Sequence, residues 1–334
     1  MRPTTLKMLL PRATLSLLTD CDNRCVFCAP DGLPAAAPRG LDAVAADLDA
    51  LRSQHTAITL TGGEPALHPA LPAIVAAARA RGFTRIGLQT NGRRLREHDY
   101  ANTLHDAGLT DVHLSLHGLG SIVHDHHTGV DGSFAEAFDG LAAARHAGLT
   151  VVVTTVLTRS NARSLTALAP WLAAQSVAAW SVAVPRTAGR LFANFDRVFP
   201  RLAMAMPHAL HALSVAQQKG VVPFLRGAPL CLLGPFASRS LPDAPRDFPP
   251  QPCGACPARP HCPGVDARYL RRFGGDELSA ARAPATAPKP FTPREEALAV
   301  MFVGEGPGGP EPTGVESPPT GAARVALPIV REGA

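Results

Sequence analysis

Strand-like apolar runs alternate with helix-like stretches from about residue 11 to residue 190, and this alternation limits the possible folds more than any other feature of the sequence. The runs expected to be strands are residues 13–19, 57–63, 85–92, 111–118, 150–158 and 177–185. The stretches between them carry apolar residues at helical spacing, most clearly in residues 40–54, 71–82, 134–148 and 162–175. Strand, helix and strand recurring in this order predict right-handed βαβ units and a parallel sheet.

Six such units without a clear seventh predict an α/β fold with an open, partial (β/α)6 parallel barrel. In barrels and open sheets of this kind, ligands bind at the carboxyl ends of the strands. We therefore expect the functional residues to lie directly after the apolar runs.

The sequence changes character beyond the sixth run, and we expect three parts. Residues 1–200 contain the alternating units and form the predicted barrel. Residues 201–278 contain a helical stretch at 204–220 and a loop-rich part at 229–275 with Pro, Gly and four cysteines, and we expect a second, smaller domain there. Residues 279–334 are dominated by Pro, Gly, Ala and Thr, a composition that predicts a flexible tail. Within that tail, residues 295–303 are the candidate for one short ordered element.

Charge and hydropathy exclude several classes of protein. The formal net charge is +5, and the excess comes from dispersed arginines rather than from a basic run typical of nucleic-acid binding. No apolar run reaches the roughly 18 residues that a membrane span needs, and residues 1–18 lack the features of a secretory signal. We expect a cytoplasmic protein that binds neither nucleic acid nor membranes. Its thiols would stay reduced, so disulfides are a poor use of its cysteines.

Four of the seven cysteines form a group in the second predicted domain: Cys231, Cys253, Cys256 and Cys262. Four thiolates can satisfy a closed tetrahedral site, and zinc and a [4Fe–4S] cluster are both chemically reasonable there. The spacing alone does not decide between these two, and unligated thiols are the third alternative.

The other three cysteines, Cys21, Cys25 and Cys28, directly follow the first predicted strand. A zinc finger would need a fourth Cys or His at short spacing, and the next histidine along the chain is His55. An iron–sulfur cubane held by three cysteines instead leaves one iron open to a ligand from outside the protein.

The Cys-x3-Cys-x2-Cys spacing after the first strand resembles the cluster motif of the radical S-adenosylmethionine (SAM) enzymes. In that family the position before the last cysteine is usually aromatic, and here it is Phe27. The resemblance implies a [4Fe–4S] cluster on these three cysteines, with SAM as the ligand of the open iron and Phe27 beside the cofactor.

A second family feature is a glycine-rich segment after the second strand, and here it is "TGGEP" at residues 61–65. Paired glycines end a strand without side-chain bulk, so backbone groups can approach a ligand, and a carboxylate could receive the ammonium group of that ligand. The resemblance implies that Gly62, Gly63 and Glu64 bind the methionine amino group of SAM. Away from the cysteine motif, the same letters would predict only a turn.

The ends of the later strands are expected to line the same pocket, as they do in similar enzymes. The further cofactor-binding candidates at these ends are Thr90, Asn91, Ser115, Thr155 and Val184. A local cap is the alternative for a strand-end Asn or Ser. No catalytic side chain can be named.

Four histidines lie close together in residues 117–129: His117, His124, His126 and His127. A metal site is one interpretation, and a role in the substrate pocket is a second. The third is a surface turn and helix start beside the pocket, which similar enzymes have at this place.

The second cysteine group resembles the C-terminal auxiliary-cluster domains called SPASM and twitch, through its Cys-x2-Cys-x5-Cys spacing. A full SPASM pattern would continue with a cysteine at position 266, which is Asp266 here, and would need more cysteines than the four present. The shorter twitch-like domain with one auxiliary [4Fe–4S] cluster is the better match. This resemblance favours iron–sulfur over zinc and predicts a small, loop-rich iron–sulfur domain after the barrel.

The resemblance implies an oxidoreductase that uses SAM-derived radicals. An electron from a low-potential donor of the flavodoxin or ferredoxin type would cleave SAM to methionine and a 5′-deoxyadenosyl radical, which abstracts a hydrogen atom from the substrate. We expect maturation of a ribosomally made peptide by crosslink, thioether formation or epimerisation, with a separate peptide-recognition protein as a possible partner.

Two alternatives to peptide maturation stay open. The first is radical modification or dehydrogenation of a small-molecule metabolite. The second is a non-catalytic iron–sulfur or zinc-binding module, and the Gly62-Gly63-Glu64 run argues against it because a scaffold does not need that run.

Overall fold

The computed structural model describes residues 12–29, 37–97, 99–244, 246–280 and 291–305. In this part of the chain, nine strands form one sheet in the order β8-β7-β6-β5-β4-β3-β2-β1-β9, and all neighbours pair in parallel. The strands are β1 (Arg12–Ser16), β2 (Ala57–Thr61), β3 (Arg85–Thr90), β4 (Asp111–Ser115), β5 (Thr150–Val156), β6 (Ala179–Ala183), β7 (Val222–Arg226), β8 (Ser240–Leu241) and β9 (Gly304–Glu305).

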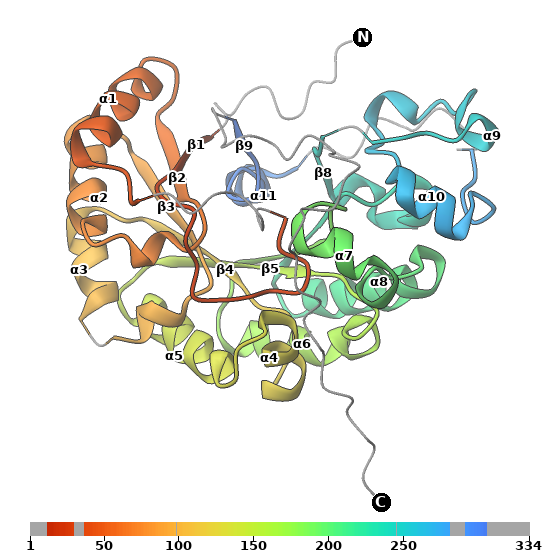
Figure 1. Cartoon of the computed structure of the whole chain (residues 1–334), viewed down its shortest axis with the longest axis horizontal. Coiled ribbons are helices and arrows are strands. Elements are labelled where there is room, and N and C mark those ends of the chain that lie inside the picture. The colour runs from red at the N-terminus through yellow and green to blue at the C-terminus, as the bar shows by residue number, and fades with distance from the viewer. Residues whose placement is uncertain (1–11, 30–36, 98, 245, 281–290, 306–334) are drawn as a thin grey trace, which may run out of the picture.

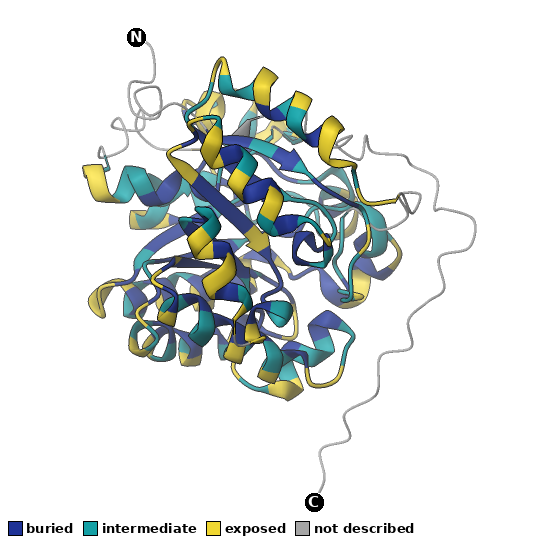
Figure 2. Ribbon diagram, turned by 90° about the vertical axis from the view of Figure 1, so that its left-hand side faces the viewer, coloured by how far each residue is buried: buried dark blue, intermediate teal, exposed yellow. Residues whose placement is uncertain are grey.

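The α-helices are α1 (Leu41–Arg52), α2 (Leu71–Ala80), α3 (Tyr100–Ala107), α4 (Ser121–Thr128), α5 (Ser133–His146), α6 (Leu165–Ala174), α7 (Gly189–Val198), α8 (Leu202–Gln218), α9 (Pro250–Cys253), α10 (Ala267–Phe273) and α11 (Pro293–Ala299). The 3-10 turns are η1 (Pro65–Leu67), η2 (Arg93–Arg96), η3 (Ala162–Ser164), η4 (Leu230–Leu232), η5 (Gly234–Arg239) and η6 (Arg259–His261). The sheet is curved, and the long helices cover its outer face (Figure 1). Figure 2 shows the buried strands beneath helices whose outer sides are exposed. The prediction of a partial parallel barrel is confirmed.

All six predicted strands are present, but each ends a few residues earlier than predicted. The reason is that the residues after these strands are often apolar or glycine, so the sequence pattern continues where strand pairing has stopped. The structure also adds a seventh strand, β7, which pairs with β6. Its short apolar run contains Pro223, and a proline argues against a strand because it lacks the N–H that the ladder needs.

The sheet therefore continues past residue 200, where the predicted barrel ended, through β7 to β8. The division of the chain into three parts stays a prediction. Of the predicted tail, residues 281–290 and 306–334 lie outside the described residues. Residues 291–305 contain α11 and β9, so the ordered element expected at residues 295–303 is present and α11 begins slightly before it.

The interior of the barrel holds both apolar and polar side chains. Near the amino ends of the strands, Arg12 of β1 and Asp111 of β4 form a buried ion pair, with two N–O distances of 2.6 and 2.5 Å. A Cβ on Gly87 of β3 would overlap both of these side chains, so the absence of a side chain there makes room for the pair. Beside them, burial lowers the pKa of His113 to about 3, which keeps this histidine neutral.

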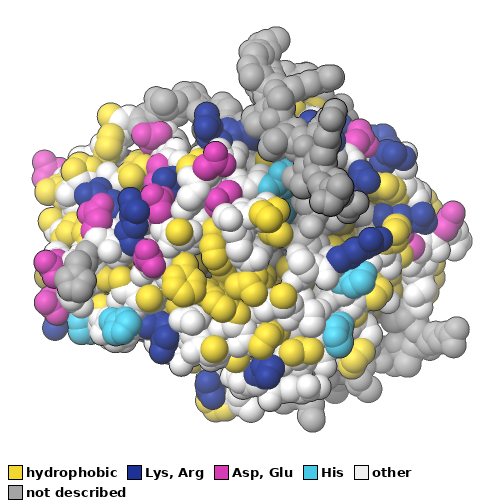
Figure 3. All heavy atoms as spheres, turned by 90° about the horizontal axis from the view of Figure 1, so that it is seen from below, with side chains coloured by type: hydrophobic (Ala, Val, Ile, Leu, Met, Phe, Trp, Pro, Cys, Tyr) yellow, Lys and Arg dark blue, Asp and Glu magenta, His cyan; other side chains and the backbone are white. Residues whose placement is uncertain are grey.

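The surface features are ordinary for an α/β domain. On the face shown in Figure 3, Lys and Arg side chains are dispersed among acidic and apolar ones. No helix in the described part of the chain is long and apolar enough to cross a bilayer.

Candidate functional site

The three clustered cysteines lie on an irregular loop, residues 17–29, which follows β1. The residues after β2 hold one side of this loop: the N–H of Gly63 donates to the Leu18 carbonyl (2.8 Å), and that of Glu64 donates to the Asp20 carbonyl (2.7 Å). A Cβ on Gly62 or Gly63 would overlap those same backbone segments. The two glycines are therefore required for the close approach of one backbone to another, in addition to any contact with a ligand.

The other side of the loop is held by segments that follow β4 and β6. The N–H of Arg24 donates to the Thr128 carbonyl (2.8 Å), and the N–H of Val26 donates to that of His127 (3.0 Å), at the end of α4. At the start of α7, the N–H of Arg190 donates to the Cys28 carbonyl (2.9 Å). The Nη1 of Arg190 also donates to the Cys25 carbonyl (3.2 Å). The cysteine loop is thus fixed by three sequence-distant segments.

The cysteine thiols are partly buried and close enough to affect one another. Burial raises the pKa of Cys21 to about 12. The backbone N–H of Asn23, which donates to the Cys21 sulfur at 3.4 Å, acts in the opposite direction. Burial and the neighbouring thiols raise the pKa of Cys25 well above its usual range. Three thiolates can share this loop only if a positively charged group compensates them, and an iron–sulfur cluster does so. The donor set therefore fits the cluster that the sequence predicts.

Glu64 is buried, with 1% of its surface exposed, and lies where the ends of β2 and β3 meet. Its Oε1 accepts from the N–H of Ala66 (2.9 Å) and from Oγ1 of Thr90 (2.5 Å), and its Oε2 accepts from the N–H of Asn91 (2.6 Å). Burial raises the pKa of Glu64 to about 7 although these hydrogen bonds act in the opposite direction. The structure thus brings together Glu64, Thr90 and Asn91, with the carboxylate already accepting from the protein.

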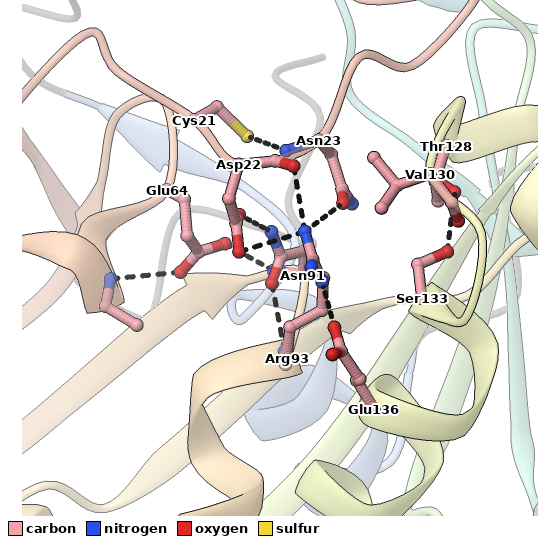
Figure 4. Close-up of polar contacts among 12 residues, drawn as sticks. Cys21, Asp22, Asn23, Glu64, Asn91, Arg93, Thr128, Val130, Ser133 and Glu136 are labelled. Atoms are coloured by element: carbon pink, nitrogen blue, oxygen red, sulfur yellow. Dashed lines mark hydrogen bonds and ion pairs between the residues drawn. The ribbon is translucent and has the colours of Figure 1, made fainter.

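Asn91 connects Glu64 to the cysteine loop, as Figure 4 shows. Its Nδ2 donates to Oδ1 of Asp22 (2.6 Å), and Asp22 also forms an ion pair with Arg93 (3.0 Å). Arg93 in turn pairs with Glu136 of α5 (2.5 Å). The sequence did not indicate these three charged residues. The only local signal was position, because Asp22 lies inside the cysteine motif and Arg93 lies two residues after Asn91.

The remaining predicted cofactor residues lie outside this network. Ser115 ends β4 and is partly exposed. The Thr155 hydroxyl is buried, donates to the Leu116 carbonyl (2.6 Å) and accepts from Nε1 of Trp180 (2.9 Å), so two protein partners already occupy it. The N–H of Val184 donates to the Arg226 carbonyl (2.9 Å).

Phe27 and the histidine group pack together behind the cysteine loop. The ring of Phe27 meets that of His117 edge-on at 4.7 Å, and His117 stacks on His124 at 5.6 Å. Burial lowers the pKa of His124 and His127 to about 4, and Nε2 of His127 contacts the Thr158 hydroxyl at 2.7 Å. These are neutral, packed histidines. Across the residues that the structure describes, no three His, Cys, Asp or Glu side chains are placed to hold a single metal ion.

The four cysteines of the second group line one cavity of about 130 Å³. Apolar side chains, among them Leu230, Phe248, Val265 and Leu278, line it with them. The sulfur of Cys262 accepts two backbone N–H groups at 3.5 Å, from Leu230 and Gly264. Burial and the neighbouring thiols raise the pKa of Cys253. Such a cavity, with thiols and N–H donors to sulfur, fits a thiolate-bound cluster.

The region next to this cavity carries a group of charges that the sequence did not indicate. Asp243, buried at its side chain, pairs with Arg186 after β6, with Arg226 of β7 (3.4 Å) and with Arg246 (3.1 Å). The N–H of Arg246 donates to the carbonyl of Pro263, which follows Cys262. Asp243 thus connects the ends of β6 and β7 to the cysteine-lined cavity.

Comparison with known proteins agrees with these features. The sequence profile of the Radical SAM superfamily matches residues 15–168. A GTP 3′,8-cyclase of Tolumonas auensis is 31% identical over 195 residues, which are 55% of this chain and 55% of that protein. One of Aeromonas hydrophila is 33% identical over 170 residues, 47% of this chain and 49% of that protein. The chain spans about half the length of these curated relatives.

Solved structures show the same fold. Streptococcus suis SuiB bound to S-adenosylmethionine superposes with a TM-score of 0.54 at 15% identity, over 66% of this chain and 52% of that one. At this identity the likeness shows the fold alone. The matched profile covers both the cysteine loop and the GGEP segment, so residues 15–168 are similar to the radical SAM superfamily in the part of the chain that carries these two features.

Proposed function

We propose that Cys21, Cys25 and Cys28 hold a [4Fe–4S] cluster with which the protein cleaves SAM reductively, as an oxidoreductase. The observation that carries this proposal is the fixed cysteine loop, which three segments hold at the carboxyl ends of the parallel strands. When bound, the cluster and SAM supply a 5′-deoxyadenosyl radical that removes a hydrogen atom from the substrate. A low-potential donor of the flavodoxin or ferredoxin type would deliver the electron.

The residues of the chain have distinct tasks in this proposal. The backbone around Gly62 and Gly63 sets the cysteine loop against the end of β2, so the SAM amino group would bind beside it. Ser115 and Val184, at the ends of β4 and β6, are proposed to line the same pocket. Phe27 and the buried histidines exclude water behind the loop.

We further propose an auxiliary [4Fe–4S] cluster on Cys231, Cys253, Cys256 and Cys262. The shared cavity supports it, as do the two N–H bonds to the sulfur of Cys262. The Cys-x2-Cys-x5-Cys spacing, which resembles that of twitch-like domains, favours iron–sulfur over zinc at this site. With a cysteine on every iron, this cluster would transfer electrons rather than bind the substrate.

For the substrate, we propose a small molecule ahead of a peptide. Two relatives that match above 30% identity are GTP 3′,8-cyclases, which by name act on a nucleotide. The structural likeness to SuiB lies at 15% identity and therefore supports the fold rather than a peptide substrate. The sequence alone had favoured peptide maturation, and the comparisons support the small-molecule alternative better.

The test is anaerobic reconstitution followed by SAM cleavage. We expect about eight irons per chain and the formation of 5′-deoxyadenosine from SAM with dithionite. Cys25→Ala should abolish the cleavage, whereas Cys256→Ala should retain part of it and bind about four irons. Zinc in place of iron, or no cleavage of SAM by the fully loaded protein, would contradict the proposal.

A further inference from the structure

We propose that Arg93 is a positioning residue that locks the cysteine loop in the shape needed to hold the cluster. Arg93 begins η2, which follows β3 after two intervening residues, and lies 65 positions beyond the last cysteine of the loop. The effect of Arg93 on the cluster rests on the proposed function, in which Cys21, Cys25 and Cys28 hold that cluster. The contacts that carry it involve only residues of this chain.

One guanidinium group joins the cysteine loop to α5. Its Nη1 donates to the backbone carbonyl of Asp22 (2.8 Å) and to Oδ1 of Asn23 (3.1 Å), and it pairs with Oδ2 of Asp22 (3.0 Å). Its Nε donates to Oε2 of Glu136 (2.5 Å). The Arg93 side chain is only 17% exposed, so these bonds are poorly screened by solvent. Figure 4 shows Arg93 between the loop and Glu136.

The two residues that Arg93 contacts belong to the three-residue segment between the first two cysteines. Asp22 and Asn23 lie between Cys21 and Cys25, and the N–H of Asn23 donates to the sulfur of Cys21 at 3.4 Å. Fixing the backbone of Asp22 and the side chain of Asn23 therefore fixes the orientation of that N–H toward the sulfur. A planar guanidinium can make these bonds and the one to Glu136 at once, whereas an ammonium group is a single point charge.

The chain offers a matched control in Arg96, three residues along the same turn. Arg96 pairs with the other oxygen of Glu136 at 3.1 Å, and no contact to the cysteine loop is described for it. Replacing either arginine removes one ion pair from Glu136. Only the replacement of Arg93 also removes the contacts to Asp22 and Asn23.

The first experiment measures amide hydrogen exchange in the metal-free full-length chain, so it does not depend on whether the proposed function is correct. We expect Arg93→Gln to speed exchange at Arg24 and Val26 about tenfold, because charge-assisted hydrogen bonds are lost. Arg96→Gln should leave these rates unchanged. Equal effects of the two substitutions, or unprotected amides in the unsubstituted chain, would overturn the proposal.

The second experiment uses the reconstituted protein and follows the loss of iron to a chelator together with the electron paramagnetic resonance spectrum of the reduced cluster. Arg93→Gln should lose iron from the first site about tenfold faster and change the spectral shift caused by SAM. Arg93→Lys, which serves if the Gln variant fails to fold, should lie between that variant and the unsubstituted protein. Iron loss and spectra identical to those of Arg96→Gln would overturn the assignment of Arg93.

Discussion

Glu64 is a buried carboxylate at the junction of β2, β3 and the cysteine loop. Its two oxygens accept from Ala66, Thr90 and Asn91, so it holds two strand ends in register with each other. Burial nevertheless raises its pKa to about 7 from an ordinary value of 4.5. A carboxyl with this pKa changes its charge close to neutral pH, which makes its contribution to stability measurable.

The first prediction concerns the pH dependence of folding. A carboxyl whose pKa is 4.5 in the unfolded chain and about 7 in the folded one takes up a proton on folding between these values. Its contribution to the free energy of unfolding is therefore full below about pH 4.5 and declines as the pH rises through about 7. We expect Glu64→Gln to remove this decline in urea unfolding of the metal-free chain.

The comparison is between the two pH profiles, because other groups titrate equally in both proteins. Glu64→Gln loses an acceptor for one of its N–H partners, and this loss shifts its profile by a constant amount. Parallel profiles across the window would contradict the prediction.

Contiguous residues of the candidate site could be predicted from the sequence, whereas the residues that hold them could not. The cysteines and the GGEP segment are short runs in which the chemistry of the residue types points to a role in the site. The partners of Asp22 lie far along the chain at Asn91 and Arg93. The sequence around an arginine in a polar stretch does not indicate which distant residue it will contact. Such pairings are set by how the strands order in the sheet, which no local pattern encodes.

At the scale of elements, the loops after β6 and β8 and the last residue of β7 meet at Asp243. Three guanidinium groups face this one carboxylate, whose own side chain is only 2% exposed. The arginines hold the pKa of Asp243 below its usual value against the effect of burial. This group joins the end of the sheet to the cavity lined by the second cysteine group.

The second prediction is that Asp243→Asn destabilises the protein by about 3 kcal/mol, because it removes the paired carboxylate from Arg246, whose side chain is only 10% exposed. The control is Asp196→Asn, which removes an exposed ion pair with Arg272 and should cost less than about 1 kcal/mol. Chemical unfolding of the metal-free proteins measures both values. A cost equal to that of the control would show that the arginines do not depend on Asp243.

At the scale of the whole molecule, residues 291–305 join opposite edges of the sheet. β9 pairs with β1, while Nη1 of Arg226 in β7 donates to the Phe302 carbonyl at 3.3 Å. Glu295 of α11 also pairs with Arg239 at 2.6 Å. Composition predicted a flexible tail for residues 279–334 as a whole, and within it residues 295–303 were the candidate for an ordered element. Its short apolar run is sufficient for order because the inside of the barrel buries it.

Phe302 is the side chain through which residues 291–305 contact both His113 and Phe224. Its ring meets that of His113 edge-on at 4.9 Å and lies 5.6 Å from that of Phe224, and 4% of the residue is exposed. We expect Phe302→Ala to lower the free energy of unfolding by about 3 kcal/mol or more, as cavity-forming substitutions in cores do. Met204→Ala, at a side chain that is 63% exposed, is the control and should cost less than about 1 kcal/mol.

The same substitution tests why His113 is neutral. Burial lowers its pKa to about 3, and Phe302 is one of the side chains that bury it. Opening this packing admits water and should raise the pKa of His113 toward its ordinary value, as followed by NMR titration of the imidazole. An unchanged pKa together with a small loss of stability would mean that residues 291–305 rest on the barrel without closing it. A raised pKa of His113 together with a large loss of stability would establish that residues 291–305 close the inside of the barrel against water.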